Sequence, residues 1–244
     1  MKSVLATITS ETPDIETSSE DYASRFRGPV GDYFLKVQSD ITLEFIRDWP
    51  GANVLDVGGG HGQNVKPLLE HGYGLTIYGS DLSCRNRVKR LYGDSSYTFQ
   101  AGPLLALPFA DRSFDVVISY RLISHTAQWR KVIEELSRVA RHAILIDFPT
   151  WNSLNALTPL LFGLKKKVEK NTRTYISFRP AELKAVFRRS GFSQITTTSE
   201  FFLPMVLHRS INRPAVTGIV ENVCRAVGLT AAWGSPVIMR GRRN

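Results

Sequence analysis

Residues 53–62 read Asn53-Val-Leu-Asp-Val-Gly-Gly-Gly-His-Gly62, a short apolar run that carries one acid and ends in closely spaced glycines. The apolar run is typical of a buried strand, and we expect a sharp turn on Gly58, Gly60 and Gly62 into a helix that begins near Gln63. Glycine tolerates positive φ, and its missing Cβ lets a ligand lie against the backbone. The first turn of a helix adds free N–H groups and a partial positive charge. The stretch therefore predicts a ligand-binding loop between a strand and a helix.

The spacing of the glycines tests which ligand the loop could hold. A dinucleotide-binding fingerprint needs the pattern G-x-G-x-x-G. Its last position falls on Gln63 when the pattern starts at Gly58, and on Val65 when it starts at Gly60. A phosphate-binding P-loop needs Gly-Lys-Ser/Thr, which this stretch lacks. Neither nucleotide motif is therefore complete.

The stretch from Asp56 has the form D-x-G-x-G-x-G, and it resembles the first motif of the class I S-adenosylmethionine (SAM)-dependent methyltransferases. A second segment, Leu107-Pro-Phe-Ala-Asp-Arg-Ser-Phe-Asp-Val-Val-Ile-Ser119, is similar to a motif of the small-molecule members, including the quinone-biosynthesis type. The resemblance covers about residues 20–147 with motifs in order, and the rest more loosely. It implies an α/β fold of the Rossmann-like kind, a doubly wound, seven-stranded, mostly parallel sheet with an antiparallel edge strand.

The resemblance implies SAM as the cofactor and S-adenosylhomocysteine as its product. The residues expected to hold the cofactor are Tyr22, Asp56, Gly58, Gly59, Gly60, Gly62, Asp81, Leu82, Gly102, Pro103, Leu104, Ser119, Tyr120 and Arg121. Asp81 closes the predicted strand 75–81, where a carboxylate can accept hydrogen bonds from both ribose hydroxyls; capping the next helix is a compatible second role. Tyr22 either covers the cofactor or only packs. Many relatives carry an acid where this chain has Gly102-Pro103, which leaves adenine recognition to backbone and apolar groups.

The methyl acceptor is expected to be a small molecule. His125 follows the predicted strand 114–119 and is a candidate general base, because a histidine pKa lies near neutral pH; a histidine that only orients the loop is the alternative. His125, Arg173, Tyr175, His208 and Arg209 are the predicted contacts to the methyl acceptor.

The chain divides into an acidic tail, residues 1–17, and one domain, residues 18–244, in which 148–178 and 203–232 are predicted insertions that build the acceptor site. A helix over 29–48 presents Phe34, Val37, Ile41 and Phe45 as its core-facing stripe. The further strands are expected at 97–101, 143–147, 192–202 and 233–240, and the further helices at 180–190 and 214–227.

Composition bounds the remaining possibilities. The chain has 244 residues, of which 43% are hydrophobic, enough for one domain with a substantial core. It contains no apolar run of the ~18 residues that a membrane span needs, and its N-terminal Val-Leu-Ala-Thr-Ile stretch is too weak for a secretion signal. Cys84 and Cys224 show no metal-binding spacing, so we expect no metal, reduced thiols and a cytoplasmic location.

Three other functions stay open at this point. The formal charge of +9 permits an anionic partner, and with it an RNA or protein methyltransferase. Ser119-Tyr-Arg-Leu122 is not the N/D-P-P-Y/F motif that nucleic-acid amino groups would call for, so nucleic acid is unlikely as substrate. A binding module of the same fold without catalysis is prompted by the missing acid near Gly102. An NAD-dependent oxidoreductase is disfavoured by the broken glycine spacing.

Overall fold

The computed structural model describes residues 11–154 and 176–244. Within them one sheet has the strand order β3-β2-β1-β4-β5-β7-β6. The strands are β1 Asn53–Val57, β2 Gly74–Gly79, β3 Thr98–Ala101, β4 Phe114–Ser119, β5 Ala140–Phe148, β6 Gln194–Ser199 and β7 Val237–Arg242. Strands β1 to β5 pair in parallel, and β7 pairs antiparallel with both β5 and β6. The predicted fold class is confirmed.

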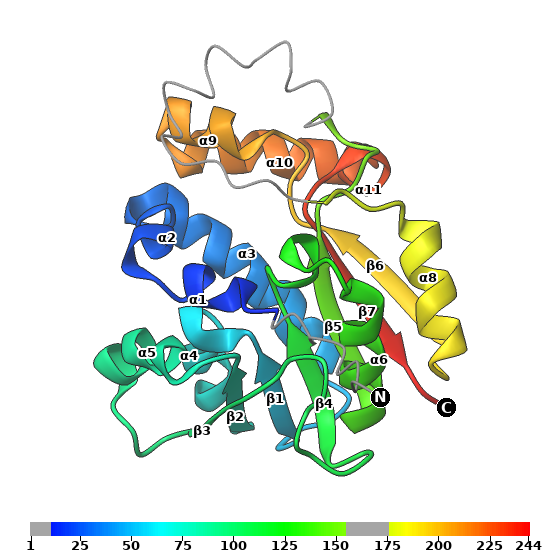
Figure 1. Ribbon diagram of the computed structural model, residues 1–244. Coiled ribbons are helices and arrows are strands. Elements are labelled where there is room, and N and C mark those ends of the chain that lie inside the picture. Colours follow the sequence, from blue (N-terminus) through cyan, green and yellow to red (C-terminus); the bar gives the residue numbers. More distant parts are fainter. Residues whose placement is uncertain (1–10, 155–175) are drawn as a thin grey trace, which may run out of the picture.

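Helices cover both faces of the sheet (Figure 1). On one face lie α3 Gly28–Ile46, α4 Val65–Glu70 and α5 Arg85–Tyr92, and on the other α6 Trp129–Val139 and α8 Pro180–Arg189. Two short helices, α1 Pro13–Thr17 and α2 Glu20–Ser24, precede α3. Between β6 and β7 the chain forms α9 Met205–Ile211, α10 Pro214–Ala226 and α11 Leu229–Trp233, which Figure 1 shows beyond one end of the sheet. The described residues also form the 3-10 turns η1 Gly59–His61, η2 Leu82–Cys84 and η3 Ile123–His125.

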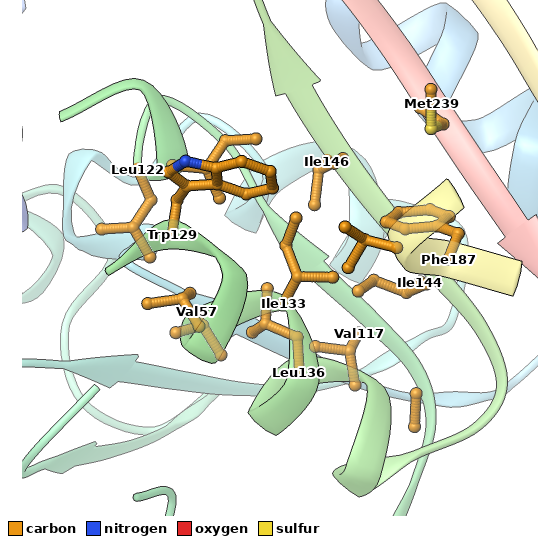
Figure 2. Close-up of a cluster of buried hydrophobic side chains, with 14 of the residues drawn as sticks. Val57, Val117, Leu122, Trp129, Ile133, Leu136, Ile144, Ile146, Phe187 and Met239 are labelled. Atoms are coloured by element: carbon orange, nitrogen blue, oxygen red, sulfur yellow. The ribbon is translucent and has the colours of Figure 1, made fainter. Parts of the chain in front are cut away.

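The core beneath α6 explains why this helix forms where it does. Trp129, Ile133 and Leu136 recur at helical spacing and are buried against Val117 of β4 and Ile144 of β5, as Figure 2 shows. Burying one such side chain contributes roughly 1.5 to 3 kcal/mol. This packing holds the ends of β4 and β5 in register, and functional residues follow at those ends.

The order of strands reverses between β1 and β4, because β2 and β3 lie on one side of this pair and β5, β7 and β6 on the other. In doubly wound sheets ligands bind at the carboxyl ends of the strands beside such a switch point. The loop after β1 and the segment after β4 therefore meet at the expected place.

The structure corrects two expectations about the N-terminal third. Residues 13–17, expected within a loose tail, form α1, and Asp14 is fully buried because its carboxylate accepts the backbone N–H of Ser80 at 2.7 Å. On α3 the buried positions include Gln38 and Thr42 beside the expected Phe34 and Phe45. The predicted stripe marked only apolar residues, whereas the inner face of α3 also includes the buried polar residues Gln38 and Thr42.

Candidate functional site

The glycine loop joins β1 to α4. Gly58 and Gly62 have φ of 76° and 83°, a region that favours glycine. Gly59 faces inward, where a Cβ would lie 2.4 Å from the carboxyl carbon of Asp56. Helix α4 begins at Val65, just after the expected start near Gln63. The loop therefore has one face packed onto Asp56 and another formed by backbone without side chains.

Asp56 supports this loop from within. Its side chain is 1% exposed, and Oδ2 accepts a hydrogen bond from the Asn64 amide at 3.0 Å. Burial raises the pKa of Asp56 to about 7, against the opposing effects of Asn64 and of the Arg121 charge. Asp56 thus supports the shape of the loop, and its contact with the cofactor stays a prediction.

His61 is a part of the site that the sequence reading missed. It lies in η1, is 4% exposed, and neither ring nitrogen has a hydrogen-bond partner among the described residues. Burial, with the charges of Arg121 and Arg87, lowers its pKa to about 2, so the ring is neutral. The rings of Tyr22 and Phe26 meet it edge-on, with centroids 5.9 and 5.3 Å away. Tyr22 therefore lies against the glycine loop, as expected of a residue near the cofactor.

Asp81 lies just beyond the carboxyl end of β2. Its Oδ1 accepts the N–H of Ser83 at 2.8 Å, so it caps η2, and hydrogen bonding by Ser83 holds its pKa below the ordinary value. The neighbouring Leu82 is 70% exposed. An ionised carboxylate beside an exposed apolar side chain is the arrangement expected for a ribose with an adjoining base.

The segment after β3 contributes mainly backbone. A Cβ on Gly102 would lie 2.4 Å from the Tyr78 hydroxyl, which itself donates to the Pro103 carbonyl at 3.4 Å. Leu104 is 1% exposed and belongs to the core. The Leu104 side chain is therefore packed in the core and is not exposed for direct contact with a cofactor.

Ser119, the last residue of β4, and the next two residues make different contacts. Ser119 is buried and its hydroxyl donates to the Val57 carbonyl at 2.9 Å. Tyr120 is turned into the core under α3, where its hydroxyl meets that of Thr42 at 2.8 Å. Arg121, whose backbone has a φ of 58°, extends its guanidinium to the amide oxygens of Gln63 and Gln38. The side chains of Ser119 and Tyr120 are thus engaged within the protein, and their cofactor contacts stay predictions.

Arg121 joins four elements. Its N–H donates to Oδ1 of Asp147 in β5 at 2.5 Å, and its guanidinium donates to the amide oxygens of Gln63 and Gln38 at 3.0 and 3.1 Å. The guanidinium also lies 4.1 Å from the ring centroid of Phe26. Arg121 therefore ties the glycine loop, β5, α3 and the α2–α3 connection together.

Two further acids face this network. Asp147 and Glu200, which follows β6, are 5% and 2% exposed, and Gln38 donates to Glu200 at 3.3 Å. Burial raises the pKa of Asp147 to about 6 and that of Glu200 to about 8, while the charge of Arg121 opposes both shifts. Titratable groups with shifted pKa values at a switch point are typical of functional sites.

The structure does not bring all the residues predicted to contact the methyl acceptor together in one site. His125 lies in η3 after β4 and is partly exposed. His208 is fully buried in the core of the α9–α11 layer, 3.0 Å from Glu221, and Arg209 points back to the Arg25 carbonyl. The pocket pair expected at His208 and Arg209 is therefore not formed, because the buried histidine pairs with a carboxylate. Arg173 and Tyr175 lie outside the described residues.

Sequence signals for the missed residues existed. The predicted strand 143–147 ends in Asp147, just as the predicted strand 75–81 ends in Asp81, so its position was a signal for a site residue; in the structure β5 continues to Phe148. Glu200 was placed inside a strand over 192–202, whereas β6 ends at Ser199. Because the predicted strand was too long at its C-terminus, the position of Glu200 just after the carboxyl end of β6 was missed.

Residues 55–143 match the family model described as "Methyltransferase domain". Sarcosine/dimethylglycine N-methyltransferase of Aphanothece halophytica is 32% identical over 126 residues, which cover 46% of this chain and 43% of that protein. Demethylmenaquinone methyltransferase of Paenarthrobacter aurescens is 31% identical, over 52% of this chain and 53% of that protein. This chain thus spans about half the length of these relatives.

Among solved structures, magnesium protoporphyrin IX methyltransferase of Synechocystis PCC 6803 with bound SAH has a TM-score of 0.65 at 16% identity, over 94% of this chain and 97% of that one. The comparisons thereby support the resemblance to class I methyltransferases, through the match over residues 55–143 and through the shared fold. In the described part of the chain no group of three or more His, Cys, Asp and Glu residues is placed to hold a metal ion. Nor does any helix there have the length and apolarity to cross a membrane.

Proposed function

We propose that this chain transfers a methyl group from SAM to a small molecule, because residues 55–143 match a methyltransferase-domain model and lie within a fold of the class I kind. One observation carries the proposal. The bare backbone of the glycine loop and the exposed carboxylate of Asp81 lie on neighbouring strands at the switch point of the sheet.

Buried polar atoms around the glycine loop lack hydrogen-bond partners within the described part of the chain, and this supports a binding site for a polar ligand there. Within the part of the chain that the structure describes, Asp56 Oδ1, both ring nitrogens of His61 and the hydroxyl of Ser80 are buried without hydrogen-bond partners. They belong to the end of β1, to the glycine loop and to the residue after β2. Buried polar groups in folded proteins are normally hydrogen-bonded. A ligand with amino, carboxylate and hydroxyl groups, as SAM is, fits such a surface.

The residues proposed to hold the cofactor are the glycine loop 58–62, Asp81 for the ribose and Leu82 for the base. The sulfonium of SAM supplies an activated methyl group. The protein then has to align the nucleophile with it and exclude water, and orientation of this kind contributes several kcal/mol to catalysis. Arg121, Asp147 and Glu200 are the polar groups at the adjoining strand ends against which we place the methyl acceptor. His125, Arg173 and Tyr175 stay predicted contacts.

A thermal-shift comparison of SAM, S-adenosylhomocysteine, NAD and NADP tests the cofactor. A ligand at ~100 times its dissociation constant stabilises the folded state by about 2.7 kcal/mol. We expect a rise in melting temperature with the two SAM-type ligands alone. A rise with NAD alone would revive the oxidoreductase, and no rise with any ligand would contradict the proposal. Binding without methyl transfer to any acceptor in a screen with labelled SAM would favour the silent binding module.

Replacing His125 by alanine should lower turnover on the methyl acceptor, because a general base contributes typically 10²- to 10⁴-fold where the nucleophile needs deprotonation. The affinity for S-adenosylhomocysteine, measured by calorimetry, should stay unchanged. Unchanged turnover in the variant would make His125 a residue that only shapes η3.

A further inference from the structure

The face of the glycine loop that has no side chains is covered by α1. The Cβ of Asp14 lies 3.6 Å from the position that a Cβ on Gly58 would take, and the Ser18 hydroxyl lies 2.2 Å from that position on Gly60. Figure 1 shows α1 beside the loop, between α2 and the start of α4. The proposed cofactor surface is therefore already occupied by the protein's own chain.

Asp14 also accepts a hydrogen bond from a backbone N–H beside the glycine loop. Its Oδ2 accepts the N–H of Ser80 at 2.7 Å and lies 3.4 Å from the thiol of Cys84, which donates to it. Ser80 immediately precedes Asp81, the proposed ribose ligand. The carboxylate of Asp14 thus lies between the glycine loop and the edge of β2, where the cofactor has to pass from one to the other.

This contact leaves several polar groups unsatisfied. Asp14 Oδ1 and the hydroxyls of Ser18 and Ser80 are buried without hydrogen-bond partners among the described residues. Helix α1 has five residues, and no side chain caps its N-terminus. Because a buried polar atom without a partner destabilises the arrangement that buries it, a ligand that offers partners can displace α1.

The segment after α1 is attached much more firmly. Ser19 caps α2 by accepting the N–H of Tyr22 at 3.1 Å, and Glu20 pairs with Arg87 of α5 at 2.7 Å and also with Arg90. Tyr22 and Phe26 pack on His61. Movement of α1, which has to take Ser18 away from Gly60, therefore has a fixed point at residues 19–20, and α2 can stay in place while α1 leaves.

We propose that α1 is a gate that competes with the cofactor, with Asp14 holding it closed on the glycine loop in the ligand-free protein. The inference rests on the proposed function, since it takes the loop to be the SAM site. It differs from a lid, which closes over a bound cofactor and strengthens its binding. A competing helix weakens binding, because the apparent dissociation constant rises as the open fraction falls.

The test compares the wild-type chain with Asp14→Ala and with Glu16→Ala. Glu16 is exposed on the same helix, so its variant removes the same charge without altering the contact with the loop. Amide hydrogen exchange of the ligand-free proteins comes first. Ser80 should exchange faster in Asp14→Ala than in the other two proteins, a readout independent of any cofactor. Equal exchange would show that Asp14 does not hold the gate.

S-adenosylhomocysteine titrations then test competition. If about nine molecules in ten are closed, Asp14→Ala should bind about tenfold more tightly and associate faster, while Glu16→Ala matches the wild type. Weaker binding by Asp14→Ala would identify a lid and overturn the gate, as would unchanged affinity in a protein whose Ser80 exchange has risen. Loss of binding in all three proteins would instead overturn the proposed function, and the gate with it.

Discussion

Replacing Arg121 by alanine is expected to lower the free energy of unfolding by roughly 3 to 5 kcal/mol at pH 8, the range for leaving a buried charge without the opposite charge that compensates it. The guanidinium lowers the pKa of the buried acids Asp56, Asp147 and Glu200. Without it three buried carboxyls face one another, and the hydrogen bonds to Gln38 and Gln63 are lost.

The loss should depend on pH in a defined direction. Burial raises the pKa values of Asp56, Asp147 and Glu200 to about 7, 6 and 8, from ordinary values of 3.8, 3.8 and 4.5. Between these limits the folded chain binds more protons than the unfolded chain, so the stability from these groups is present at low pH and is lost as the pH rises through the folded values. Removing Arg121 raises the folded pKa values further. The deficit of the variant should therefore be small at pH 5 and grow toward pH 8.

Urea unfolding at pH 5 and pH 8 measures this dependence. Arg130→Ala is a matched control, because Arg130 also lies 4.1 Å from an aromatic ring centroid, that of Trp129, and pairs with Glu182 at 2.5 Å, yet at the surface. Surface pairs contribute about 0 to 1 kcal/mol. An equal loss at both pH values in Arg121→Ala would show that its packing, and not its charge, stabilises the fold.

Replacing Asp81 by alanine is expected to weaken S-adenosylhomocysteine binding by roughly 1 to 3 kcal/mol, or about 5- to 150-fold, the cost of losing hydrogen bonds from a charged group. Isothermal calorimetry on the folded variant measures the change. Unchanged affinity would rule out the ribose role.

Capping is the competing explanation, because Asp81 also accepts the N–H of Ser83. Asp81→Asn keeps one oxygen for that cap and loses the second anionic acceptor. Full recovery of affinity in Asp81→Asn would assign the effect to η2, whereas a partial recovery is expected if both ribose hydroxyls are bound. Asp94→Ala controls for charge, since Asp94 is an acid that pairs with Arg85 and Lys89 on the surface of α5.

The sequence by itself indicated the fold class, through the resemblance of residues 53–62 and 107–119 to class I methyltransferases, and it marked the loop that we propose for the cofactor. Local chemistry is enough to place this loop, because the positive φ at Gly58 and Gly62 favours glycine and the apolar run before them is typical of a buried strand. The acid closing the next strand marked Asp81 by position alone.

Only the tertiary structure decided which polar side chains share the site. Asp147 and Glu200 come near Arg121 because β4, β5 and β6 end at one edge of the sheet, and Gln38 of α3 joins Arg121 to Glu200 by hydrogen bonds to both. It also decided that His208 is a buried partner of Glu221, and that Asp14 leaves the expected tail to lie on the glycine loop. A side chain's burial and its partners come from elements distant in sequence, so no local pattern in the chain specifies them.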